Sequence, residues 1–540
     1  TVVQVSNNTF QHLGLALDEC LQRPLHLVSE SLAEQLQARV TEPLLEPLSF
    51  QCDLTVRGQR QTFEAALHRQ QACLLLELEP GRQNVPSVVL PGEQLVAHLE
   101  ESLQRFSAAT TLGTLLDAVV GRVRDVTGYD RVMVYRFRPD DSGEVIAESC
   151  PDDMEPFLGL RYPASDIPPQ ARWLYLRNRL RVIPDARYRP VPVIPALRRE
   201  GLPLDLSHHV LRSVAPVHLE YLHNMGVAAS MSISIVSGDR LWGLIACHHR
   251  VPRRVPPGIR AAAELFGLFV SMRVAAREQD AMVSRYLHAQ HVRDAVSDQL
   301  ARAGDAQSAL VAALPQLRAT LDSDGVVLLS GLERHEDGRV PSPAHWPGLR
   351  RWLQHHAGAT VAMTDRAEDW RTDAVDDDGL AGVMAIHLGA GERLLLFRRE
   401  QVEDVRWAGD PAKAMVPTDD GLRIAPRKSF ATWVETVRGR AEPWSDGDRR
   451  GAARLHALLS EQRWRAAAQA RAHEHDTIDQ HSRRHAVRDH QQRLDGISSL
   501  LEGLVHLDVD ATREFGSRIA RLEQDIRALM LSRDRSAGTG

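Results

Sequence analysis

Strict alternation of polar and apolar residues marks the segment from 230 to 236 of this 540-residue chain. Successive side chains of a β-strand point to opposite faces, so the two kinds of residue separate. One face carries Ser230, Ser232 and Ser234, and the other carries Met231, Ile233 and Ile235. A strand with one hydroxyl face and one apolar face favours a sheet that covers a polar ligand.

Short apolar runs bounded by turn residues predict further strands. Near the N-terminus they are Thr1–Val5 and Leu74–Leu78, which indicate a small α/β domain. Two hairpins follow, one from Arg131–Phe137 and Gly143–Glu148, the other from Met231–Val236 and Leu241–Cys247. A third α/β domain, roughly 303–455, has predicted strands at Gly325–Leu329, Gly382–His387 and Arg393–Phe397.

Helical periodicity covers three stretches. It spans 94–126, returns from Pro256 for about 45 residues, and holds from about 445 to the end. A helical pattern much longer than about 25 residues indicates a coiled coil or an interdomain spine. In the last stretch, apolar residues on both sides of His506–Asp510 have the alternating spacing of a coiled-coil seam. This pattern predicts a helical hairpin that buries its seam by pairing with another chain.

Composition narrows the classes of protein. The chain has 65 Lys and Arg against 71 Asp and Glu, a net charge of −6 without a basic block, which argues against nucleic acid as the main partner. Only Lys413 and Lys428 are lysines, and the many arginines are scattered as background. Five Cys without a CxxC pair favour a reducing, cytoplasmic compartment. No apolar run reaches the roughly 20 residues that span a membrane, so no membrane contact is expected.

Four segments carry candidate chemistry. They are Pro163–Pro168 (PASDIP), Leu211–Gly226 (LRSVAPVHLEYLHNMG), Trp242–His249 (WGLIACHH), and Trp407–Asp410 together with Pro426–Phe430. Taken singly, Asp166 is an ordinary turn residue, and His218 and His248 are ordinary core histidines. Taken together and in this order, the segments resemble the bacteriophytochromes, which are biliverdin-binding red/far-red photoreceptors. The resemblance covers residues 1 to about 450.

The resemblance implies a multidomain α+β fold with central antiparallel sheets flanked by helices. It implies a PAS domain at 1–95, a GAF domain at 96–275, a PHY domain at 276–455 with a hairpin arm, the tongue, at about 400–432, and a helical output linker at 456–540. Long spine helices join the domains, and a C-terminal helical hairpin ends the chain. The expected assembly is a homodimer through the spine and C-terminal helices.

The resemblance also implies roles for single residues. Asp166 accepts pyrrole N–H groups through its carbonyl and pairs with Arg427 of the tongue through its carboxylate. His218 lies near the central pyrrole rings, and His248 bonds the ring D carbonyl. The propionate-binding set is Arg181 and Arg212, helped by Tyr175, Ser230 and Ser232. The remaining cofactor contacts are Met133, Tyr135, Tyr162, Ile167 and Tyr221, and Trp407 and Ser429 belong to the tongue.

Departures from the family pattern affect the cofactor. Val217 stands where plant and cyanobacterial phytochromes attach their bilin to a Cys, so the expected cofactor is biliverdin. Bacteriophytochromes use a Cys ahead of the first PAS strand, and the chain begins with Thr1 at about that strand. The attachment Cys is therefore expected upstream of residue 1, since Cys20 lies too far into the PAS domain. Ala215 replaces a common Ser, and Ala408 replaces a Gly of the usual WGG.

Most bacteriophytochromes end in a histidine kinase, which implies a two-component output with a response regulator as a partner. His490 on the predicted seam is the candidate phospho-acceptor, and His485 is the fallback. The many histidines of this helix give an ordinary alternative explanation. Whether the parent protein is an enzyme stays open, because no ATP-binding domain follows in this chain. His481 and His485 lack a third ligand, so no metal site is expected.

Two other classes of function remain. The chain could be a GAF-type sensor for another small ligand, without photochemistry and with the PHY-like domain as a spacer. It could also be a structural scaffold that dimerises through its long helices. Loss of photoconversion on replacement of Asp166 by Ala would separate the photoreceptor from both.

Overall fold

The computed structural model describes residues 1–40, 48–70, 73–81, 92–198, 201–302, 306–331, 333–372, 378–389, 391–411, 415–418, 421–424, 430–505 and 520–525. Contacts divide the chain into two units. The first comprises Thr1–His288 with Glu400–Ala441, and the second comprises Ala289–Arg399 with Glu442–Gly540.

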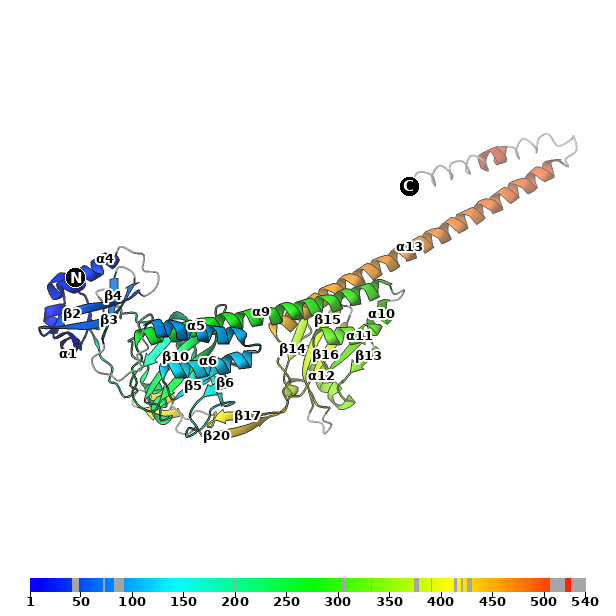
Figure 1. The fold of residues 1–540 in the computed structure, drawn as a ribbon. Helices are drawn as coiled ribbons and strands as arrows, with labels where there is room; N and C mark the ends of the chain where they lie inside the picture. The colour runs from blue at the N-terminus through cyan, green and yellow to red at the C-terminus, as the bar shows by residue number, and fades with distance from the viewer. Residues whose placement is uncertain are drawn as a thin grey trace. The chain divides into compact units, whose positions relative to one another are not determined.

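The N-terminal part of the first unit is a three-stranded antiparallel sheet with short helices (Figure 1). Its strands are β2 (Leu48–Val56), β3 (Gln59–Gln70) and β4 (Cys73–Pro80), and its helices are α1 (Thr9–Leu13), α2 (Leu17–Cys20), α3 (Leu25–Val28) and α4 (Glu30–Val40). Leu32 and Leu36 of α4 pack on Leu54 and Phe63 of the sheet. The strand predicted at Leu74–Leu78 lies within β4.

The strand predicted at Thr1–Val5 is wrong in its extent. The structure has only β1 (Val5–Ser6), which pairs antiparallel with the equally short β9 (Val193–Ile194). A partner nearly 190 residues away therefore sets the position of β1, and the local apolar pattern does not contain that information.

The central sheet of the first unit has eight strands in the order β20-β17-β7-β6-β5-β11-β10-β8. The strands are β5 (Arg131–Phe137), β6 (Gly143–Ser149), β7 (Arg161–Tyr162), β8 (Leu180–Ile183), β10 (Ala229–Ser237), β11 (Arg240–His249), β17 (Glu403–Ala408) and β20 (Thr432–Val437). Both predicted hairpins of this region are present, as β5–β6 and β10–β11.

One face of this sheet is covered by three helices, α5 (Gly92–Ala108), α6 (Leu112–Thr127) and α9 (Pro257–Arg302) (Figure 1). Their apolar residues, such as Phe106, Leu116 and Phe266, share a core with Val132, Met231 and Ile245 of the strands. The helical stretch predicted at 94–126 is two helices, because Thr111 caps the second one. Its hydroxyl accepts the Thr114 backbone N–H at 3.1 Å.

The other face of the sheet carries shorter elements. They are the 3₁₀ turn η1 (Ala164–Asp166), α7 (Pro169–Arg177) and α8 (Pro216–Asn224). The 400–441 segment, which contains the expected tongue, adds β17 and β20 to the edge of the same sheet, with Trp407 of β17 registered beside Arg161 of β7. A separate small hairpin joins β18 (Met415–Thr418) and β19 (Gly421–Ile424).

The second unit has its own five-stranded antiparallel sheet, in the order β13-β12-β16-β15-β14. The strands are β12 (Gly325–Ser330), β13 (Glu333–Gly338), β14 (Val361–Thr364), β15 (Leu380–Gly389) and β16 (Glu392–Arg399). The shorter helices are α10 (Ala306–Ala312), α11 (Leu314–Thr320), η2 (Pro343–His345), α12 (Trp346–His355) and η3 (Ala367–Asp369). The three strands predicted for this region lie within β12, β15 and β16.

A 60-residue helix, α13 (Asp446–Val505), follows the second sheet (Figure 1). Its first turns pack on one face of that sheet through Ala452, Leu455 and Leu459, while α12 covers the other face. The first arm of the predicted C-terminal hairpin is thus helical, but its turn at 506–510 lies outside the described residues. No helix among the residues that the structure describes is long and apolar enough to cross a membrane.

Candidate ligand-binding site

The face of the central sheet away from α6 and α9 carries buried polar side chains. Ser230 of β10 is registered opposite His248 of β11, and Ser232 is registered opposite Arg181 of β8. All four residues expose less than a tenth of their surface. Directly opposite residues on neighbouring strands point to the same face, so β10 supplies hydroxyls between a histidine and an arginine. The predicted alternation is present, because the intervening Met231 joins the core on the opposite face.

Two arginines, Arg181 and Arg212, lie near one another at one end of this polar face. Arg181 donates from Nη2 to the backbone carbonyl of Arg212 at 2.8 Å. Arg212 in turn donates to the carbonyls of Ser207 and His209. Burial, followed by the charge of Arg212, lowers the pKa of Arg181 to about 10. Two cations held together inside the protein attract an anion strongly, because the surrounding dielectric is low.

Arg181 also has spare hydrogen-bonding capacity. Its buried Nη1 has no hydrogen-bond partner among the described residues. A cavity of about 120 Å³ lies beside Arg181 and Arg212 and is also lined by Tyr188, Arg254 and Arg260. Buried donors nearly always find an acceptor, so this arrangement fits a carboxylate supplied by a ligand.

His248 presents a second unpartnered group on the same face. Its Nδ1 is buried and has no hydrogen-bond partner within the described part of the chain. Burial, together with the charge of Arg131, lowers the pKa of His248 to about 3. The imidazole is therefore neutral at pH 7, with one ring nitrogen able to donate and the other able to accept. These two unpartnered groups fit a ligand that has both an anionic end and a carbonyl.

Asp166, Tyr221 and His218 lie together over the sheet. The hydroxyl of Tyr221 donates to Oδ2 of Asp166 at 3.2 Å. The rings of Tyr221 and His218, three residues apart on α8, stack with centroids 6.3 Å apart. Burial, followed by the charge of Arg181, lowers the pKa of His218 to about 4. The edge of Phe430, from the tongue, meets the Tyr221 ring at 5.2 Å.

An aromatic and apolar cluster completes the site. Met133, Tyr135 and Tyr162 are each at most 5% exposed and pack with Phe157 and with Ala408 of the tongue. The rings of Tyr135 and Tyr162 lie 5.7 Å apart. Ile167 and Tyr175 border the same cluster. Predicted ligand contacts from Met133 on β5 to His248 on β11, far apart in the sequence, thus lie on or beside the central sheet.

The predicted tongue residues are only partly described. Trp407 lies in β17, faces Trp433 in the register, and donates from Nε1 to Glu435 at 2.7 Å. Arg427 and Ser429 lie outside the described residues. His490 and His485 lie on the exposed surface of α13, far along the chain from the polar face.

Several residues near the site were not identified from the sequence. Glu77 of β4 is buried and accepts the backbone N–H groups of Val210 and Leu211, which precede Arg212. Its place in the apolar run LLLEL was the available signal. Arg131 and Glu148 form a buried ion pair at 2.9 Å on the strands beside His248. The sequence gives no signal for this pair, because the chain contains 65 Lys and Arg and 71 Asp and Glu.

A larger cavity of about 630 Å³ lies in the second unit. It is lined by residues of α12, β14 and η3, among them Arg351, Trp352 and Trp370. None of the predicted site residues borders it, and the unpartnered buried groups described above belong to the central sheet of the first unit.

Comparison with protein families agrees with this geometry. Residues 1–81 match the PAS fold, residues 111–276 match the GAF domain, and residues 289–467 match the phytochrome region. These three matches in succession define a multidomain sensory module of the PAS-GAF-PHY type. The α+β multidomain architecture predicted from the sequence is confirmed.

Individual relatives identify the family. The chain is 35% identical over 468 residues to cyanobacterial phytochrome B of Nostoc sp., and 36% identical over 443 residues to a bacteriophytochrome of Pseudomonas aeruginosa. These alignments cover 85% and 81% of this chain but only 62% and 60% of the relatives. The chain thus spans about three fifths of the length of these curated relatives.

Solved structures of phytochromes are similar to this chain in both sequence and fold. The photosensory core module of the Stigmatella aurantiaca phytochrome is 36% identical, with a TM-score of 0.71 and coverage of 86% of this chain and 92% of that one. A bacteriophytochrome from R. palustris is 31% identical, with a TM-score of 0.70 and coverage of 85% and 92%. The chain belongs to the phytochrome family and contains its photosensory module.

Proposed function

We propose that this chain senses red and far-red light with biliverdin bound on the polar face of its GAF domain. The observation that carries the proposal is a pair of buried groups on one face of one sheet, Nη1 of Arg181 and Nδ1 of His248, which have no hydrogen-bond partner among the described residues. A linear tetrapyrrole offers propionate carboxylates to the first and a lactam carbonyl to the second. When bound, biliverdin supplies absorption of red light and isomerisation at ring D.

The protein's residues would hold the cofactor by charge and shape. Arg181 and Arg212 bind the propionates, with Tyr175, Ser230 and Ser232 beside them. The Asp166 carbonyl accepts pyrrole N–H groups, His218 lies beside the central rings, and His248 donates to the ring D carbonyl. The apolar contacts around ring D are Met133, Tyr135, Tyr162 and Tyr221, with Ile167 nearby.

The choice of biliverdin depends on the start of α8. Val217 stands one residue before His218, at the position where a Cys attaches the bilin in plant and cyanobacterial phytochromes. A valine forms no thioether, so attachment would use a Cys upstream of residue 1. Biliverdin is the bilin for which that upstream attachment is expected.

Reconstitution tests the proposal. Biliverdin added to the chain should give a red absorption band that converts to a far-red band under red light. Asp166→Ala should lose most of this photoconversion, because the carbonyl and carboxylate contacts are disturbed at the centre of the chromophore. Asp153→Ala is a matched control, since Asp153 pairs with Arg250 on the surface of the same domain. A colourless wild-type protein, or full photoconversion in Asp166→Ala, would refute the assignment.

We further propose a route for the signal. The Asp166 carboxylate pairs with Arg427 of the tongue in one state, and separation of this pair releases the tongue to refold between strand and helix. β17 and β20 represent the strand form of the tongue stem. Arg427→Ala should therefore alter photoconversion or the rate of dark recovery. Unchanged values of both would disprove the coupling.

The output is proposed to be a two-component histidine kinase in the cytoplasm, with a response regulator as its partner. His490 on α13 is the candidate phospho-acceptor. Homodimerisation through the spine is supported by exposed apolar residues on α9, including Leu265, Leu268 and Met272, each more than 40% exposed. An apolar stripe of this kind is favourable when a second helix covers it.

A further inference from the structure

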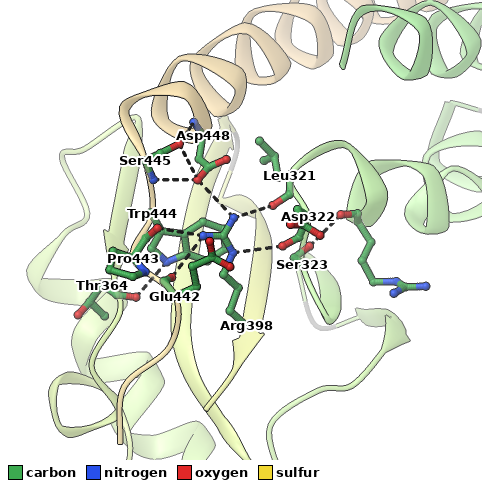
Figure 2. A network of polar contacts seen from close by, with 11 residues as sticks. Leu321, Asp322, Ser323, Thr364, Arg398, Glu442, Pro443, Trp444, Ser445 and Asp448 are labelled. Carbon is green, nitrogen blue, oxygen red and sulfur yellow. Dashed lines mark hydrogen bonds and ion pairs between the residues drawn. The ribbon is translucent and has the colours of Figure 1, made fainter. Parts of the chain in front are cut away.

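Arg398, the penultimate residue of β16, uses all of its donors inside the second unit (Figure 2). Its side chain is only 8% exposed. Nε donates to the Asp322 carbonyl at 3.1 Å, and Nη1 donates to the carbonyls of Glu442 and Pro443 at 3.3 and 3.2 Å. Nη2 donates to the Leu321 carbonyl and to Oδ2 of Asp448, both at 3.3 Å. A guanidinium has five N–H donors, so every one of them is satisfied.

The acceptors come from parts of the chain that are far apart in sequence. Leu321 and Asp322 precede β12, whereas Glu442 and Pro443 lie about 120 residues later. The guanidinium stacks on the ring of Trp444, with Cζ of Arg398 3.9 Å from the ring centroid. Trp444 also donates from Nε1 to the carbonyl of Thr364, at the end of β14. Figure 2 shows these segments converging on Arg398. We call this group the Arg398 cluster: Leu321, Asp322, Thr364, Arg398, Glu442, Pro443, Trp444, Ser445 and Asp448.

The cluster includes the N-terminus of α13. Oδ2 of Asp448 accepts the backbone N–H and the hydroxyl of Ser445, and the Ser445 hydroxyl accepts the Asp448 N–H at 3.1 Å. These reciprocal bonds form a capping box, which satisfies backbone donors at a helix start. Arg398 binds the same oxygen of Asp448. The cap of α13 and the end of β16 are therefore joined through one carboxylate oxygen.

The Arg398 cluster lies at the point where the chain leaves the second unit for residues 400–441 and returns from them. Residues 400–441, which include the tongue, begin two residues after Arg398 and end immediately before Glu442. Arg398 therefore links the end of β16 to Glu442, 44 residues later, where the chain returns from the 400–441 segment. Both ends of this segment and the first turn of α13 meet at one buried side chain.

We propose that Arg398 is a positioning residue that holds both ends of the 400–441 segment, which contains the tongue, and the first turn of α13 as one unit, so that a change in the tongue displaces α13. The part that concerns light depends on the proposed photoreceptor function. Lysine could not replace Arg398, because an ammonium has only three donors and no planar face to stack on Trp444. The cluster thus provides a mechanical path from the tongue to the long helix that leads to the output.

The first test needs neither light nor cofactor. In the full chain, Arg398→Met should speed amide hydrogen exchange at 445–450 about tenfold or more, since charge-assisted hydrogen bonds to the cap are lost. Arg399→Met is the matched control. Its side chain is the next along the strand, is 71% exposed and pairs with Asp324 at the surface. Equal exchange in the two variants and the wild type would overturn the proposal.

The second test uses the biliverdin-loaded chain. The wild type and Arg399→Met should show a light-dependent change in exchange along 450–505. Arg398→Met should keep normal photoconversion spectra but lose this change in α13. A preserved α13 response, or lost photoconversion, would refute the positioning role. If the wild type does not photoconvert, the proposed function fails, and the first test still decides whether the cluster holds the cap.

Milder variants cover the case in which Arg398→Met does not fold. Arg398→Lys keeps the charge but not the five bonds, and Asp448→Asn keeps an acceptor for Ser445 while removing the ionic contact. Both should move exchange at 445–450 in the same direction as Arg398→Met, by a smaller factor. Circular dichroism identifies variants that retain the fold. Wild-type exchange in both folded variants would contradict the proposal.

Discussion

Replacement of Gly143 by Ala should disturb the candidate chromophore site through the ring of Tyr135. Gly143 begins β6 and is registered between Phe137 of β5 and Tyr162 of β7. A Cβ at this position would lie 1.7 Å from Cζ of Tyr135 and 2.0 Å from its hydroxyl oxygen. Nonbonded carbon atoms need about 3.5–4.0 Å, so the ring must move by about 2 Å.

The ring has little room to move. Tyr135 is 5% exposed, and its ring packs edge-on against Phe137, with centroids 5.3 Å apart, and tilted against Tyr162, with centroids 5.7 Å apart. Overpacking of a buried site costs about 1–3 kcal/mol. For a domain of this size, such a loss corresponds to a fall of about 2–12 °C in the midpoint of thermal unfolding. Tyr135 is also one of the proposed contacts of ring D, so displacement of its ring would alter that contact.

The assay combines thermal unfolding with absorbance of the biliverdin-loaded chain. Gly143→Ala should lower the midpoint and reduce or shift the photoconverting band. Gly121→Ala is the control, because a Cβ there meets no atom within 4 Å and the residue lies inside α6. That substitution should stabilise the protein by about 0.5–1 kcal/mol and leave the spectrum unchanged. An unchanged midpoint and an unchanged spectrum in Gly143→Ala would refute the reasoning.

Three further predictions concern the first unit. Burial lowers the pKa of His209 to about 4, below its ordinary value of 6.5, so the unfolded chain binds more protons between these values. The free energy of unfolding should therefore fall as the pH decreases from about 6.5 to about 4, and urea titrations should show a flatter dependence for His209→Gln; equal slopes would contradict the assignment. Glu77→Gln should weaken the loop that precedes Arg212 by about 1–3 kcal/mol and reduce biliverdin affinity, because the carboxylate accepts two backbone N–H groups. Urea unfolding and biliverdin titration measure these effects, and wild-type values in both would exclude this role. Met272→Glu, which places a charge on the exposed apolar stripe of α9, should weaken dimerisation in sedimentation velocity, whereas a fully retained dimer would place the interface elsewhere.

Both hairpins of the central sheet were predictable, because each strand shows its hydrophobic pattern within a few residues of sequence. The alternation from 230 to 236 follows from the two-residue period of a strand, and the structure places these serines and apolar residues on opposite faces. β3 was missed, although it is the central strand of its sheet, since its sequence QRQTFEAALHRQ has no long apolar run and its first residues are exposed. The break at Thr111 was also missed, because apolar periodicity continues on both sides of the cap.

The sequence by itself determined the family, the order of the domains and the residue types that a bilin requires. Those features depend on motifs and on side-chain periods that are read within a few residues. Only the tertiary structure decided which charged residues act together. Arg398 is one of many arginines in the sequence, and its five bonds exist because residues 321, 322, 442, 443 and 448 fold around it. Such a cluster depends on contacts between residues up to 80 positions apart, and no local pattern encodes them.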